Sequence, residues 1–396
     1  MQAVIISFDS LAANSLGCYG NEWIETPNLD RLAADGIVFD QHYADTVGAQ
    51  AGLSWATGEH TSLSQTAAQS TSFGKQLQAA GVKSTLITAD SLNPWQATWD
   101  FTETQSIDCS SGLQRTPDQV PIARLVKAGI QSWQQVDGSS SSRLLWIHAP
   151  APQAPPEGFD SLYFEDFEER GQSFEGLSPE QLADHPAVYA GSVSLIDHWI
   201  GELLSAVRAH ERGSPTMIVV TAARGHRWHH IEQFGGTILS KERPPLCDQL
   251  MRTPLILNLS DDQHFAGNVS LRSNRLVQSS DFVATLLDWF GTASTQATSS
   301  QQSRSWLREI TEEVAPRSQL IVSDDRANIA LRTADWLCIQ DHSTKPTAEV
   351  ADSHPAGRVF LYAKPDDIWD VDDIASQQPD LVGQLIDLIP TIKPAS

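Results

Sequence analysis

Short runs of apolar residues recur along the chain, each long enough for one buried β-strand. Runs of about four to eight apolar residues bounded by turn residues are typical of strands buried on both faces. We therefore expect these runs to form one central sheet. They lie at residues 4–8, 84–90, 144–149, 216–222 and 253–260.

Between these runs the apolar residues change to helical spacing. Thr26 is a plausible N-cap, Pro27 suits the first helical position, and Gly36 suits the position just past a helix end. Strands that alternate with helices predict an α/β fold with a mostly parallel sheet. The predicted helices lie within residues 26–39, 188–210 and 281–291.

The pattern changes after residue 291. Residues 292–305 are polar and of low complexity, which is typical of a linker or loop. Beyond them come short strand-like runs with turns and a final amphipathic segment near 379–389. We expect an α/β domain over 1–291, a linker over 292–305, and a small sheet-plus-helix domain over 306–396.

Charge and composition exclude some classes of function. The 396 residues carry a net charge of −23, with a pI near 4.7, so binding of nucleic acid through a basic surface is not expected. No segment approaches the roughly 20 apolar residues of a membrane helix. The start Met1–Phe8 lacks the features of a signal peptide, which favours a cytoplasmic protein. The four cysteines are widely spaced and predict no disulfide framework.

The end of one predicted strand carries unusual residues. Residues 219–226 read VVTAARGH, so Ala222, Ala223 and Arg224 stand where a strand of the sheet ends. Ligands and metals bind at the carboxyl ends of strands in open α/β sheets. Two methyl groups and a guanidinium are a poor set of ligands for such a position.

Several stretches together resemble the sulfatases of the alkaline phosphatase superfamily. They are SFDSLAANSLGCYG, ETPNLDRLAADGIVFDQHYADT, SWATG, YAGSVSLIDHWIGELLSAVR and the tail LYAKPDDIWDVDDIASQQPDLVGQLIDLI. The resemblance implies a central mixed, mostly parallel sheet flanked by helices, with a smaller C-terminal α+β domain. It also implies hydrolysis of sulfuric esters. The family site has a divalent ion, usually calcium, and a formylglycine made from Cys or Ser in a C/S-x-P-x-R motif.

The family's metal positions are only partly kept. The pair of acidic residues after the first strand falls at Asp9 and Ser10, and the later Asp–His pair falls at Ala223 and Arg224. Asp9 is thus the only retained family ligand. Calcium prefers about six to eight oxygen ligands, and a fixed guanidinium repels a cation.

The nucleophile segment is also changed. Counting from Thr57-Gly58 places the nucleophile at Gly48 and the motif arginine at Gly52. Without a thiol or hydroxyl at position 48, covalent catalysis by the family route is lost. The expected Pro-His dipeptide is Pro152-Gln153, and Lys241 is a possible remnant of a substrate-binding lysine.

These changes predict a pseudoenzyme with no cofactor. In this hypothesis Arg224 occupies the metal position and pairs with Asp9; the alternative is that Arg224 turns outward into solvent. The pocket would be formed by Asp9, Ser10, His148, Arg224, His226 and Lys241. It would bind a small anionic or sugar-like ligand, with Trp55 and Trp228 near its rim unless they belong to the core. The sequence leaves the oligomeric state open.

In a second hypothesis the chain is an active enzyme. His226, His229 and His230 lie close together in GHRWHH. With Asp9 or His148, His226 and His230 would hold zinc or manganese. The chain would then be a metal-dependent hydrolase of sulfate or phosphate esters with a rewired site and one divalent metal.

Overall fold

The computed structural model describes most of the chain. The described residues are 1–61, 63, 72–89, 94–109, 116–135, 142–153, 155–156, 159, 163–165, 168, 185–210, 213–227, 244–260, 271–292, 303–311, 314–342 and 358–390.

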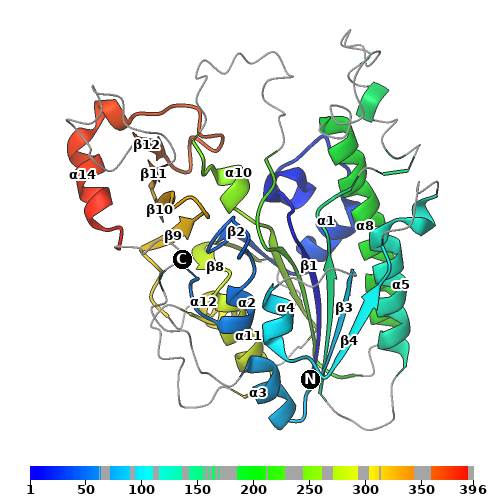
Figure 1. Ribbon diagram of the computed structural model, residues 1–396. Coiled ribbons are helices and arrows are strands. Elements are labelled where there is room, and N and C mark those ends of the chain that lie inside the picture. The colour runs from blue at the N-terminus through cyan, green and yellow to red at the C-terminus, as the bar shows by residue number, and fades with distance from the viewer. Residues whose placement is uncertain are drawn as a thin grey trace.

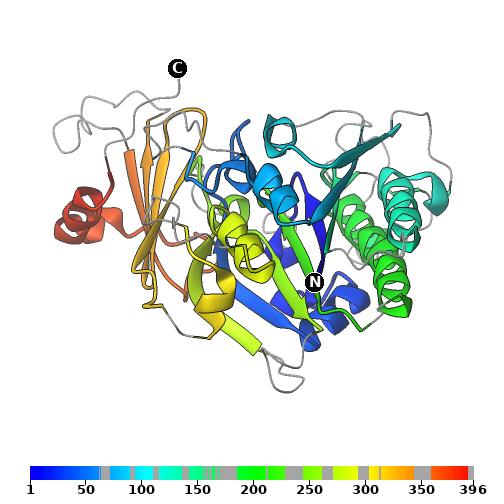
Figure 2. The ribbon, with the colours of Figure 1, turned by 90° about the horizontal axis from the view of Figure 1, so that it is seen from below.

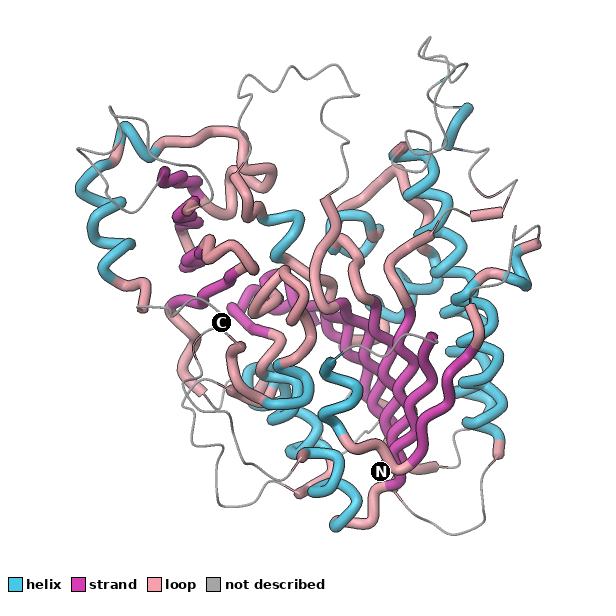
Figure 3. The backbone as a smooth tube through the Cα atoms, viewed as in Figure 1, coloured by secondary structure: helices cyan, strands magenta, loops and turns pink. Residues whose placement is uncertain are grey.

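An eight-stranded sheet crosses the molecule (Figure 3). Strand β7 is antiparallel to both its neighbours β6 and β2, and every other pair in this sheet is parallel. In the order β4-β3-β5-β1-β6-β7-β2-β8 the strands are Glu103–Ile107, Lys83–Ala89, Arg143–Ala149, Gln2–Phe8, Thr216–Ala222, Leu255–Leu259, Ile37–Tyr43 and Leu271–Gln278.

Helices cover both faces of this sheet (Figure 1). One face carries α1 (Pro27–Ala34), α5 (Pro121–Gln134) and α8 (Pro186–Ala209), and Figure 2 shows α5 and α8 side by side. The other carries α2 (Ser54–Thr57), α3 (Phe73–Ala79), α4 (Pro94–Trp99), α11 (Asp281–Trp289) and α12 (Trp306–Ile310). The short helix α10 (Asp248–Met251) precedes β7.

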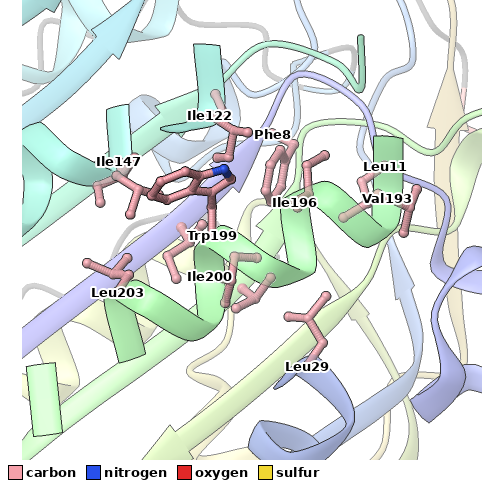
Figure 4. Close-up of a cluster of buried hydrophobic side chains, with 14 of the residues drawn as sticks. Phe8, Leu11, Leu29, Ile122, Ile147, Val193, Ile196, Trp199, Ile200 and Leu203 are labelled. Carbon is pink, nitrogen blue, oxygen red and sulfur yellow. The ribbon is translucent and has the colours of Figure 1, made fainter. Parts of the chain in front are cut away.

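Each face has its own apolar core. Phe8, Ile147 and Ile196 meet between β1, β5 and α8 on the first face (Figure 4). Trp55, Trp146 and Phe282 belong to the core of the second face. Burying this much apolar surface is the main force that holds the layers together.

A second, four-stranded antiparallel sheet lies beside β8. Its order is β12-β11-β10-β9, from Arg358–Ala363, Trp336–Asp341, Ile329–Thr333 and Gln319–Ser323. Helix α14 (Pro379–Asp387) packs against it through Val382 and Leu385.

The predicted fold class is confirmed: a mixed, mostly parallel sheet flanked by helices, with a small second sheet. The predicted strands correspond to β1, β3, β5, β6 and β7, and the predicted helices to α1, α8 and α11. The helix predicted within 26–39 spans Pro27–Ala34, and Gly36 follows its C-cap Asp35 as predicted; residues 37–39 begin β2. Thr26 makes no side-chain cap; its hydroxyl accepts from Gly17 N and donates to Asp30 instead.

The predicted domain limits stay a prediction. Most of the linker at 292–305 lies outside the described residues. Helix α12 packs on the large sheet, with Trp306 fully buried beside Phe282. All four cysteines are free thiols, and no helix among the described residues is long and apolar enough to cross a membrane.

Candidate functional site

The carboxyl ends of β1, β5 and β6 meet at one edge of the large sheet. Their register places Phe8 beside both Ala149 and Ala222. Past the strand ends, Asp9 N donates to Ala149 O at 3.0 Å, and Leu11 N donates to Arg224 O at 3.0 Å. Asp9, Ser10, His148 and Arg224 are therefore neighbours, as the sequence predicted for parallel strands.

A line of hydrogen bonds ends on Asp9. Trp146 Nε1 donates to Ser7 Oγ at 2.8 Å, and Ser7 Oγ lies 2.8 Å from His148 Nδ1. His148 Nε2 lies 3.0 Å from Asp9 Oδ1. Because the serine hydroxyl already accepts from Trp146, it is free to donate to His148 Nδ1. His148 then carries its proton on Nε2 and donates it to the Asp9 carboxylate.

This arrangement has the composition of a Ser–His–Asp triad but not its accessibility. Ser7 is fully buried on β1, whereas a nucleophile must reach its substrate. The rings of Trp55 and Trp95 pack edge-on against His148, with centroids 6.2 and 5.1 Å away. The line therefore fixes the orientation of His148 and Asp9 and does not supply a nucleophile.

Arg224 is exposed, and its Nη1 donates to Val47 O at 3.2 Å. The hydrogen bond given to Arg224 thus goes to the backbone of the loop after β2, while Asp9 accepts from His148. The sequence predicted that Arg224 pairs with Asp9; the contact given for Arg224 is with Val47. A backbone carbonyl satisfies a guanidinium N–H and leaves the rest of the group in water.

The predicted nucleophile position is filled from another part of the chain. A Cβ atom built on Gly48 would lie 2.1 Å from Oδ1 of Asp325, in the turn between β9 and β10. Asp325 Oδ2 accepts a hydrogen bond from Ala49 N at 2.8 Å. A side chain at position 48 and this carboxylate cannot both keep their places.

The position of the family's motif arginine is also closed. Gly52 has a φ of 82°, a conformation that L side chains rarely adopt. A Cβ atom there would lie 3.1 Å from Trp95 and 3.2 Å from Trp55. Trp55 is fully buried, so it belongs to the core and not to a pocket rim.

The other predicted residues are placed differently. The imidazole of His226 stacks on Tyr189, with centroids 4.4 Å apart and planes 3° apart. Gln153 is exposed at the mouth of a small apolar cavity. Trp228, His229, His230 and Lys241 lie outside the described residues.

The described donors do not by themselves fit a calcium ion. The Asp9 side chain is 40% exposed and offers a carboxylate, but Ser10 is buried and the side chain of Ala223 has no donor atom. In the part of the chain that the structure describes, no group of three or more His, Cys, Asp or Glu residues could hold a metal. A six- to eight-oxygen site would need ligands from beyond these residues.

Sequence reasoning missed Asp325 and Trp95. Asp325 lies 277 positions after Gly48 (325 minus 48) on a different sheet, so no spacing rule links them. Gly48 itself was the available signal, since a glycine is often present where another group approaches the backbone closely.

Comparison with known proteins places these observations in a family. A protein-family model described as Sulfatase matches residues 2–292. Mouse steryl-sulfatase (Mus musculus) is 49% identical over 41 residues, and human arylsulfatase D (Homo sapiens) is 46% identical over 41 residues. Each match covers 10% of this chain and only 7% of the relative's length.

Solved structures share the fold over nearly the whole chain. A protein solved with its substrate D-glucosamine-2-N,6-O-disulfate has a TM-score of 0.72, at 16% identity over 98% of this chain and 96% of that one. The phosphonate monoester hydrolase of Agrobacterium radiobacter has a TM-score of 0.67, at 15% identity over 98% and 94%. The putative sulfatase yidJ of Bacteroides fragilis has a TM-score of 0.69, at 16% identity over 97% and 93%.

The match corrects the expectation that no cofactor is needed. Sulfatases typically use a divalent metal, calcium, together with formylglycine, so a divalent metal is what the family implies for this chain. The predicted resemblance is confirmed, because the family model covers well over half of the residues and the fold agrees from end to end. The chain belongs to the sulfatase family.

Proposed function

We propose that this sulfatase-family protein does not hydrolyse sulfate esters by the formylglycine route, and that it binds a sugar-like ligand at the retained edge of the sheet. The observation that carries the proposal is the Asp325 carboxylate at the place of a side chain on Gly48. The family's covalent step needs a nucleophilic oxygen there, and glycine has none.

The surrounding geometry supports the same proposal. The motif arginine position at Gly52 has a left-handed backbone, and Ala223 offers no ligand to a metal. Asp9 accepts from His148 within a line of buried hydrogen bonds. At these positions other residues of the chain therefore make their own packing and hydrogen-bond contacts, so the family's functional groups are replaced and not simply absent.

A small, mostly apolar hollow adjoins the ends of the strands. It lies between the ends of β1 and β5 and the helices α5 and α8, and it is partly open to solvent. Solved relatives of this fold are described with a disulfated glucosamine and with a neocarrahexaose. A sugar presents apolar C–H faces as well as hydroxyl groups, which suits the apolar surface near the ends of β1 and β5.

The test combines binding with turnover. The melting temperature is measured with increasing D-glucosamine or D-glucosamine 6-sulfate in the presence of calcium, and released sulfate is quantified by ion chromatography. We expect a saturable rise in melting temperature without sulfate release, because a ligand that binds only the folded state stabilises it. Sulfate release, or no response to any sugar of the panel, would contradict the proposal.

A further inference from the structure

The turn that carries Asp325 is firmly built. Asp324 Oδ1 accepts from Arg326 N at 2.8 Å and from Asn328 N at 2.9 Å, and Asp324 Oδ2 accepts from Asn328 Nδ2 at 2.7 Å. Asn328 is fully buried, and its Oδ1 accepts from His342 N at 2.7 Å. These bonds hold the turn between β9 and β10 in one shape.

The same turn is joined to the loop after β2. Val47 N donates to Ser323 O at 3.0 Å, Ser323 N donates to Asp45 O at 3.1 Å, and Thr46 pairs with Ser323 in a short parallel bridge. Strand β9 thus lies against this loop as well as next to β8 (Figure 1). Two residues past Ser323, Asp325 reaches the backbone at Gly48.

The charge at this position is the reverse of what a sulfate group requires. An anion needs N–H donors or cations, but the Ala49 N–H already donates to Asp325 Oδ2. The carboxylate stands where the side chain at position 48 would project. The nearby guanidinium of Arg224 donates to Val47 O. A second anion at this place would be repelled by the Asp325 carboxylate, and the Ala49 N–H that it would need already donates to Asp325.

We propose that Asp325 is a specificity-determining residue, a resident carboxylate that excludes sulfate and other anionic groups from the position beside Gly48. The inference rests on the proposed function and gives its ligand class. The site takes sugars that present hydroxyl or ammonium groups to Asp325, because a carboxylate accepts from such donors.

The direct test uses inorganic sulfate as the probe. Sulfate binding is measured by isothermal titration calorimetry at constant ionic strength in the full-length wild type, in Asp325→Ala, and in Asp387→Ala as a control. Asp387→Ala removes the same charge from the end of α14. We expect sulfate to bind Asp325→Ala with a dissociation constant at least about tenfold lower than it shows for the wild type and Asp387→Ala. Equal binding in all three proteins, or none in Asp325→Ala, overturns the inference.

A mutant cycle tests the geometry independently of any ligand. The unfolding equilibrium is measured in urea for the wild type, Gly48→Ala, Asp325→Ala and the double variant. Gly48→Ala alone must displace the exposed Asp325 carboxylate and weaken its bond to Ala49 N, so we expect it to shift the equilibrium toward the unfolded state by up to about fivefold. In the Asp325→Ala background the same change has little effect. If Gly48→Ala changes the unfolding equilibrium equally in the wild type and in Asp325→Ala, the contact between position 48 and Asp325 is contradicted.

The two proposals fail in different ways. Release of sulfate from a sulfated substrate by the wild type would contradict the proposed function, whatever the result for Asp325. Equal sulfate binding by the wild type and Asp325→Ala, without hydrolysis of a sulfated substrate, would contradict only the inference about Asp325.

Discussion

At the scale of single residues, the line from Trp146 to Asp9 shows how the site is held. Ser7 contacts both Trp146 Nε1 and His148 Nδ1, and all three residues are buried. One hydroxyl group thus satisfies two buried polar atoms.

Ser7→Ala is therefore expected to destabilise the fold. Both atoms lose their partner inside the core, and the free energy of unfolding should fall by on the order of 2 kcal/mol. Urea denaturation measures this change. Ser205→Ala is the matched control, because Ser205 is exposed on α8, and it should stay within about 0.5 kcal/mol of the wild type. Similar values for both variants would show that Ser7 is not needed.

A second residue-scale prediction concerns pH. Burial lowers the pKa of His42 from 6.5 to about 4, against a smaller opposing effect of the Asp281 carboxylate. His42 is therefore neutral in the folded protein near pH 5, while the unfolded chain takes up a proton below pH 6.5. Protonation of the unfolded chain costs stability as the pH falls from 6.5 toward 4, and this stability is fully present above pH 6.5.

The variant His42→Gln isolates this contribution. Between pH 7 and pH 4 the wild type should lose on the order of 3 kcal/mol more of its unfolding free energy than the variant does. Urea unfolding at several pH values gives both curves. Parallel curves for the two proteins would mean that His42 titrates normally in the fold.

The sequence predicted the position of a single residue correctly only where the path of the backbone alone sets that position. Parallel strands end at the same edge, so Asp9, His148 and Arg224 had to be neighbours. Where their side chains point is set by groups on other elements. Arg224 reaches Val47 on the loop after β2, and His226 lies on Tyr189 of α8. Neither contact follows from a pattern in the sequence.

At the scale of elements, one buried ion pair joins the two sheets. Arg317, just before β9, donates from Nη1 and Nη2 to the two carboxylate oxygens of Asp281 on α11, both at 2.8 Å. The Asp281 side chain is fully buried, and its oxygens also accept from Gln278 N and Arg304 N. The pair fixes where β9 begins relative to α11.

Arg317→Ala should be among the more damaging single changes. It leaves a carboxylate buried without its cation, which costs about 3–5 kcal/mol of unfolding free energy. Arg326→Ala is the control, because Arg326 is exposed in the turn after β9, and a loss below about 0.5 kcal/mol is expected there. Thermal or urea denaturation compares them, and a small loss in Arg317→Ala would contradict the role given to this pair.

The elements that the sequence predicted are those with a clear apolar pattern. Strand β6 reads TMIVVTA and is buried along its whole length, so its limits were found without error. Strand β8 reads LRSNRLVQ, with only its last residues buried, and was not predicted. Its place in the sheet comes from pairing with β2, a contact distant in sequence that outweighs local propensity.

At the scale of the whole molecule, the family scaffold is kept, whereas the residues at the predicted site positions differ from the family motif. The fold agrees with these solved structures along nearly the whole chain, although identity is only 15–16% in the three examples above. Packing of the core tolerates such divergence when volume and patterning are preserved. Catalysis depends on a single nucleophile, and the predicted nucleophile position, Gly48, is approached by the Asp325 carboxylate from the turn between β9 and β10. Family membership therefore gives the fold, while the activity depends on individual side chains.

The central claim is tested most directly by turnover. Hydrolysis of p-nitrophenyl sulfate and p-nitrophenyl phosphate is followed with calcium, magnesium, manganese or zinc supplied, for the wild type and for Asp9→Ala. We predict that the two proteins give the same rate as buffer with metal alone, because position 48 has no nucleophile and Asp325 occupies its place. A wild-type rate clearly above that background, lost in Asp9→Ala, would show a working site and contradict the account.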